Sequence, residues 1–226
     1  MTALLLLGLA VLATCTVLAA RPVSAWQRAY VSSLDPVVPA PSRTGLLGPL
    51  PQAALTLACG GAVLVWGART AALPAAVLTL PVMTPLVAAA SVDAVCHRLP
   101  NRLLVWAAGA AMVSTCALAT LDRVWTAPFT AVGAAALVGT ISLVLSRLGS
   151  GMGLGDVKLM AVVGLWLGRT GLVAPLWALA VGFLLAGPVV LLGLALRRLG
   201  PKDLIAFGPY LVAGAALVWG ATASGP

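Results

Sequence analysis

The segment AALPAAVLTLPVMTPLVAAASV, residues 71–92, contains no charged residue and ends directly before an aspartate, Asp93. A helix needs roughly 20 apolar residues to cross the hydrocarbon core of a bilayer, so this segment is long enough to span it. Further apolar runs lie at about residues 3–20, 52–68, 103–120, 127–146, 157–168, 172–196 and 207–223. The pattern predicts an all-α integral membrane protein, a polytopic bundle of about eight transmembrane helices (six to eight).

The composition of the whole chain supports a membrane location. Of its 226 residues, 62% are hydrophobic and 8% are charged, which leaves too little polar surface to cover a water-soluble globule. The 13 lysines and arginines lie singly between apolar runs, a pattern that favours membrane topology and argues against a nucleic-acid partner. The four cysteines also lie singly, without a CxxC pair, and are interpreted as small apolar residues.

The distribution of basic residues predicts the orientation in the membrane. With the N-terminus outside, the cytoplasmic connections are 21–51, 97–102, 147–158 and 197–206. They hold ten of the 13 basic residues, whereas the opposite connections hold Arg69, Arg123 and Arg169. This asymmetry is expected for eight spans with both termini outside.

The N-terminal segment has two interpretations. A small-residue sequence, PVSA at 22–25, follows the first apolar run and resembles the cleavage site of a secretory signal. No basic residue precedes that run, however, and Arg21 and Arg28 follow it, which favours a retained helix. We therefore divide the chain into an N-terminal transmembrane helix with a Pro-rich cytoplasmic loop, 1–51, and a polytopic membrane domain, 52–226.

Few residues can carry ionic chemistry, because the chain has no glutamate and a single histidine, His97. Three of the five aspartates, Asp35, Asp122 and Asp203, lie in connections and are interpreted as surface charges. Asp93 and Asp156 each adjoin a predicted transmembrane helix on the cytoplasmic side. An ionisable residue at membrane depth indicates a functional site, since its desolvation is costly.

Each of these two aspartates also has an ordinary explanation. Asp93 could be an interfacial residue paired with Arg98 or His97, and Asp156 could cap a helix N-terminus. Three glycines, Gly151, Gly153 and Gly155, lead into Asp156. They provide backbone freedom that a cap does not need and allow another chain to approach closely.

Together, two carboxylates on one side of a membrane can share a proton, so that one stays protonated while the other activates water. This is the chemistry of aspartic proteases. From the predicted helix ends, the dipoles favour the shared proton on Asp93 and the charge on Asp156. The chain lacks the ligands of a zinc site, because it has a single histidine, no glutamate and only dispersed cysteines. We therefore expect neither a metal nor a cofactor.

Three stretches, in order, resemble the type IV prepilin peptidases, membrane aspartic proteases of the GxGD type. DAVCHRLPN (93–101) resembles the first catalytic segment, and GMGLGDVKLMAVVGLWLG (151–168) resembles the second. FGPYLVAGA (207–215) resembles the closing helix of the family. The resemblance covers roughly residues 75–215 and implies that Asp93 and Asp156 are the catalytic pair.

The resemblance implies a multi-pass endopeptidase of the bacterial inner membrane, with its active site facing the cytoplasm. Its substrates would be type IV pilin-like precursors, from which it removes a basic leader peptide. Membrane lipid would surround it. The residues expected to bind substrate or to shape the loops are Gly151, Gly153, Gly155, Lys158, Arg98, Pro100 and Asn101. Lys158 and Arg98 would hold the polar edge of the site or contact lipid phosphate, and Asn101 would cap the next helix.

One departure from the family bears on the activity. Larger relatives carry paired CxxC motifs in the first cytoplasmic loop, associated with an N-methyltransferase region, and loop 21–51 contains no cysteine. We interpret the chain as the compact, peptidase-only form. Two alternatives remain open, a small proton-coupled transporter and a non-catalytic membrane protein of pilus assembly. Cleavage of a co-expressed precursor separates both from a peptidase.

Overall fold

The computed structural model describes residues 1–34, 44–148, 151–197 and 205–223, and within them the chain is helical and forms no strand. The α-helices are α1 (Thr2–Leu18), α2 (Ser24–Ser32), α3 (Pro49–Arg69), α4 (Leu73–Cys96), α5 (Asn101–Asp122), α6 (Ala127–Arg147), α7 (Leu154–Leu167), α8 (Ala174–Ala195) and α9 (Gly208–Ala223). Each of the eight apolar runs forms a helix, which confirms the predicted polytopic bundle.

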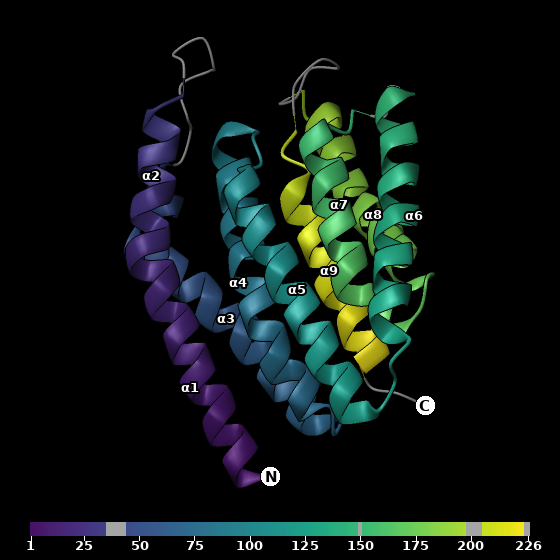
Figure 1. Cartoon of the computed structure of the whole chain (residues 1–226). Coiled ribbons are helices and arrows are strands. Elements are labelled where there is room, and N and C mark those ends of the chain that lie inside the picture. The colour runs from purple at the N-terminus through teal and green to yellow at the C-terminus, as the bar shows by residue number, and fades with distance from the viewer. Residues whose placement is uncertain (35–43, 149–150, 198–204, 224–226) are drawn as a thin grey trace.

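Within the described parts of the chain, six helical segments are long and apolar enough to cross a membrane. They are residues 2–32, which join α1 and α2, and helices α3, α4, α5, α6 and α8. Helices α7 and α9 are shorter, with 14 and 16 residues. Figure 1 shows the helices running alternately up and down, so that α1 begins and α9 ends at the lower end. At the upper end α4 ends, and α5, α7 and α9 begin.

Helix α4 lies at the centre of the bundle. In its span, 78% of the residues are buried, whereas in the other five spans the share is 44% or less. It packs against α1, α3, α5 and α9. The last turn of α4, which carries Asp93, is therefore surrounded by other helices.

Glycines allow two pairs of helices to pack at close range. A Cβ atom at Gly164 of α7 would lie 2.4 Å from the Cα atom of Ala135 in α6. A Cβ atom at Gly214 of α9 would lie 2.6 Å from the carbonyl oxygen of Ala178 in α8. In lipid, such close backbone approach is a main source of helix association, because the lipid chains are as apolar as the helices.

Replacing Gly164 with alanine is expected to destabilise the bundle by about 1–3 kcal/mol, because the new methyl group meets a backbone atom that cannot rotate away. Gly109 in α5 is the matched control, since a Cβ atom there meets nothing within 4 Å. The midpoint of thermal unfolding of the purified protein in detergent measures both effects. Equal midpoints for G164A and G109A would show that the α6–α7 contact does not depend on the glycine.

The N-terminal helix is longer than the sequence predicts. The connection 21–51 was expected to be a loop, but helix continues through a π-helical turn, Ala19–Val23, into α2 and ends at Ser32. The wider turn accommodates Pro22, which has no N–H and would clash with the preceding turn of a regular α-helix. Asp35, Asp203 and residues 36–43 of the Pro-rich loop lie outside the described residues.

Candidate active site

Asp93 lies in the last turn of α4 and is 5% exposed. The N–H of Gly208, the first residue of α9, donates a hydrogen bond of 2.8 Å to Asp93 Oδ2. Within the described residues, neither His97 nor Arg98 forms an ion pair with this carboxylate, so the ordinary explanation of Asp93 as the partner of one of them does not hold. The partner of Asp93 is the N-terminus of a helix that follows it by more than 100 residues.

Asp156 lies in the first turn of α7 and is 7% exposed. The N–H of Gly153 donates to Asp156 Oδ2 at 3.0 Å, and the N–H of Asp156 donates to the Gly153 carbonyl at 3.1 Å. This reciprocal pair is a capping arrangement, so the capping interpretation of Asp156 is confirmed. It does not exclude a chemical role, because a capping carboxylate is held in one orientation.

The three glycines before Asp156 have different environments. Gly151 adopts φ +77°, a left-handed conformation in which other residues are strained. Gly155 packs closely, since a Cβ atom there would lie 3.1 Å from the Cβ atom of Leu99. Gly153 supplies the N–H that binds Asp156, and a Cβ atom there would make only ordinary contacts.

The segment that follows Asp93 along the chain contacts the start of α7. His97 ends α4 in a left-handed conformation, and Pro100 precedes α5 as its N-cap residue. Asn101 makes no capping hydrogen bond. Its side-chain Oδ1 instead accepts a hydrogen bond of 3.0 Å from Lys158 Nζ. The prediction that Asn101 caps a helix is therefore wrong.

The two aspartates lie at the same end of the bundle, in the last turn of α4 and the first turn of α7. Both are buried. Each accepts a hydrogen bond from a backbone N–H at the beginning of a helix, α9 for Asp93 and α7 for Asp156. Two such groups suit the sharing of one proton and the activation of a water molecule.

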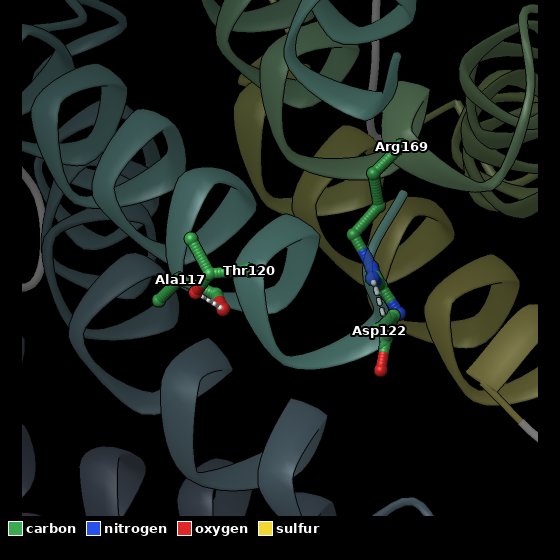
Figure 2. Close-up of polar contacts among 4 residues, drawn as sticks. All are labelled: Ala117, Thr120, Asp122 and Arg169. Atoms are coloured by element: carbon green, nitrogen blue, oxygen red, sulfur yellow. Dashed lines mark hydrogen bonds and ion pairs between the residues drawn. The ribbon is translucent and has the colours of Figure 1, made fainter. Parts of the chain in front are cut away.

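Asp122 lies at the other end of the bundle. Figure 2 shows Arg169 extending from the end of α7 toward it, and Arg169 Nη1 lies 3.3 Å from Asp122 Oδ2. The neighbouring Thr120 hydroxyl donates to the Ala117 carbonyl of its own helix at 2.6 Å. Nowhere in the described part of the chain do three His, Cys, Asp or Glu residues gather as metal ligands.

A comparison with protein families finds the type IV leader peptidase family over residues 80–196, just over half of the chain. The chain belongs to this family. Searches of curated proteins and of solved structures find no significant match. The matched region includes both Asp93 and Asp156 and ends before Gly208.

Membership makes the chain a leader peptidase, a hydrolase whose family acts on prepilin-like substrates. The six long apolar helices agree with a multi-pass membrane peptidase. The family assignment therefore bears out the resemblance, and two of the three stretches that indicate it, 93–101 and 151–168, lie within the matched region.

Of the residues expected at the site of this leader peptidase, Gly153 and Gly155 adjoin Asp156, and Pro100, Asn101 and Lys158 lie where the segment after Asp93 contacts α7. Asp93 lies at the same end of the bundle, in the last turn of α4. Arg98 is exposed in the same segment. Gly208 was not among the predicted site residues. The signal that could have found it was the FGP sequence at 207–209, which the resemblance assigned to the closing helix without a role.

Proposed function

We propose that this leader peptidase is an aspartic endopeptidase that removes the basic leader from type IV pilin-like precursors, with Asp93 and Asp156 as its catalytic pair. The observation that carries the proposal is the arrangement of two buried carboxylates at one end of the bundle, each fixed by a helix-terminal N–H. Residues 52–226 form the catalytic unit in this proposal, and 1–51 an N-terminal helix and loop.

The two carboxylates share one proton at the start of the reaction. The ionised carboxylate takes a proton from water as the water oxygen attacks the scissile carbonyl carbon, and the protonated carboxyl gives its proton to the carbonyl oxygen. The resulting diol collapses and the C–N bond breaks: the carboxyl that took its proton from water gives it to the leaving nitrogen, and the other carboxylate takes a proton from a diol hydroxyl. The pair then again shares one proton. The products are the free leader and the trimmed precursor.

The site faces the cytoplasm in this proposal. Its end of the bundle carries the connections that hold most of the basic residues, as the positive-inside rule requires for a cytoplasmic face. Gly151 and Gly153 lie on the exposed approach to α7, where an extended substrate can lie along the backbone. Lys158, held by Asn101, marks the polar edge of this approach.

The function is tested by incubating the purified full-length protein with a precursor that carries a basic leader and an apolar helix. Mass spectrometry of the products then locates the cut. Cleavage at the boundary between the leader and the helix supports the proposal, and it excludes a transporter or a non-catalytic assembly protein. A precursor that stays intact, although the peptidase is folded and present in excess, contradicts it.

Cleavage is also expected to continue in the presence of EDTA and 1,10-phenanthroline, at the same rate as in their absence. The reason is the inventory of side chains: with one histidine and no glutamate, the chain lacks the ligands of a hydrolytic zinc site. The initial rate of precursor cleavage measures this. A loss of rate on chelation that added zinc restores would contradict the proposed mechanism.

A further inference from the structure

An apolar cavity of about 620 Å³ lies between the N-terminal helical arm, residues 2–32, and helix α5. Residues from four helices line it, among them Cys15 and Leu18 of α1, Trp26 of α2, Pro81 and Pro85 of α4, and Trp106 of α5. In Figure 1 the arm lies at the edge of the bundle, beyond α4. The cavity therefore occurs where a molecule in the membrane can reach it from the side.

A second hollow, of about 450 Å³, adjoins this cavity. Its lining is more polar and includes Tyr30, Ser33 and Asn101. Trp26 and Arg102 line both spaces, so the two meet at this pair. The guanidinium carbon of Arg102 lies 5.9 Å from the centre of the Trp26 ring, a cation–π arrangement at the boundary.

The polar hollow extends the cavity toward the aspartates. Leu99 and Asn101 line it. Leu99 packs against Gly155, and Asn101 accepts the hydrogen bond from Lys158. Gly155 and Lys158 flank Asp156 in the sequence. An apolar space, a polar space and the candidate catalytic pair thus follow one another along this side of the bundle.

The arm that forms the outer wall is fixed to the core by buried polar contacts. Gln27 of α2 donates to the Ala88 carbonyl of α4 at 2.8 Å and approaches Gln52 Oε1 of α3 at 3.4 Å. Both glutamine side chains are 1% exposed or less. The wall is therefore anchored on the α3–α4 side and leaves the α5 side open.

We propose that the apolar cavity docks the hydrophobic helix of the precursor, and that the polar hollow takes the segment between that helix and the bond to be cut. This inference rests on the proposed function and names where its substrate binds. Because the bond to be cut lies next to the apolar helix, the substrate must hold that helix in an apolar space and the extended backbone beside the bond in a space nearer the carboxylates. The two adjoining spaces match this requirement in polarity and in their order toward Asp156.

The wall of the cavity favours a peptide over a lipid chain. Pro85 has no N–H to donate to the carbonyl of Pro81, four residues earlier, and both prolines line the cavity. A side-chain hydroxyl of a docked helix can donate to such a carbonyl, whereas an acyl chain cannot. Arg102 has no carboxylate partner among the described residues, so it is available to an acidic side chain or a carbonyl of the bound segment.

Site-specific photo-cross-linking tests the docking in the intact membrane protein. A photoreactive amino acid, p-benzoylphenylalanine, replaces Trp106 in the cavity or, as the control, Trp177 of α8. The two tryptophans match in exposure, at 69% and 62%, and Trp177 lines neither space. Asp156→Asn in both proteins keeps the precursor uncut. We expect the precursor to cross-link several-fold more at position 106.

A kinetic measurement supports the cross-linking. Ala110 lines the cavity, and A110L, which adds bulk there, is expected to raise KM for the precursor roughly tenfold by overpacking the contact. The matched control is A136L, on the exposed face of α6, for which KM stays at the wild-type value. Equal KM values for A110L and A136L overturn the docking site.

The outcomes separate the docking site from the proposed function. Cleavage by the wild-type protein with equal cross-linking at 106 and 177 overturns the docking site alone. Cross-linking of position 106 to phospholipid, maintained in the presence of excess precursor, overturns it in favour of a lipid site. A precursor that the wild-type protein leaves uncut overturns the proposed function, and the docking site with it.

Discussion

Replacing either Asp93 or Asp156 with asparagine is expected to lower the rate of precursor cleavage by about 10²–10⁴-fold, the contribution of a general acid or base. Asparagine keeps the size of the side chain and one acceptor oxygen. It can therefore still accept the N–H of Gly208 or of Gly153, and the local fold is preserved. Only the ability to take up and give back a proton is lost.

The control for this experiment is Asp122→Asn. Asp122 lies at the opposite end of the bundle, where its ion pair with Arg169 is partly exposed, and such pairs contribute roughly 0–1 kcal/mol to stability. Initial rates with purified protein, normalised to the amount of folded protein, measure all three variants. Activity of D93N or D156N close to that of D122N would contradict the catalytic assignment.

The double variant provides a further test of whether the two aspartates act together. When two groups act as a unit in catalysis, the effects of replacing them do not add. The first substitution already abolishes the joint function, so the second one lowers the rate little further. We therefore expect D93N/D156N to be about as slow as the slower single variant. A rate equal to the product of two independent losses would indicate separate roles for the two carboxylates.

The helices could be predicted from the sequence, because each apolar run has to satisfy its backbone within itself once it is in lipid. The length of α7 was also visible, since its apolar run is short between Asp156 and Arg169. The helical arm to Ser32 was missed. Polar residues such as Gln27 favour a loop in a prediction from the sequence. Only the buried contacts of the Gln27 side chain with α3 and α4 explain why the helix continues.

The two aspartates could be predicted because charges are so rare in this chain. Their partners could not. The predicted bias of the shared proton toward Asp93 rested on its place near the end of α4. The structure adds the N-terminus of α9, whose Gly208 N–H points at the same carboxylate. Both carboxylates then lie at a helix N-terminus, and the argument from helix ends does not distinguish them.

Gly208→Ala is expected to lower precursor cleavage by about 10²-fold, the effect of misplacing a reacting group by roughly 1 Å. A Cβ atom at position 208 would lie 2.9 Å from Asp93 Oδ2 and 3.3 Å from its Cγ, so the carboxylate has to move. Alanine keeps the backbone N–H. The loss would therefore report the position of the Asp93 carboxylate and not the removal of its hydrogen-bond donor.

Gly220→Ala in the same helix is the matched control, because a Cβ atom there would come no closer than 3.7 Å to its nearest neighbour, the Trp66 indole. Both substitutions add one methyl group to α9, so a general effect on helix stability or membrane insertion should appear in both. Rates of cleavage at equal amounts of folded protein separate the two cases. If G208A cleaves the precursor as fast as G220A, the contact between α9 and Asp93 does not position the carboxylate for the reaction, and the role of the FGP segment must be sought in packing instead.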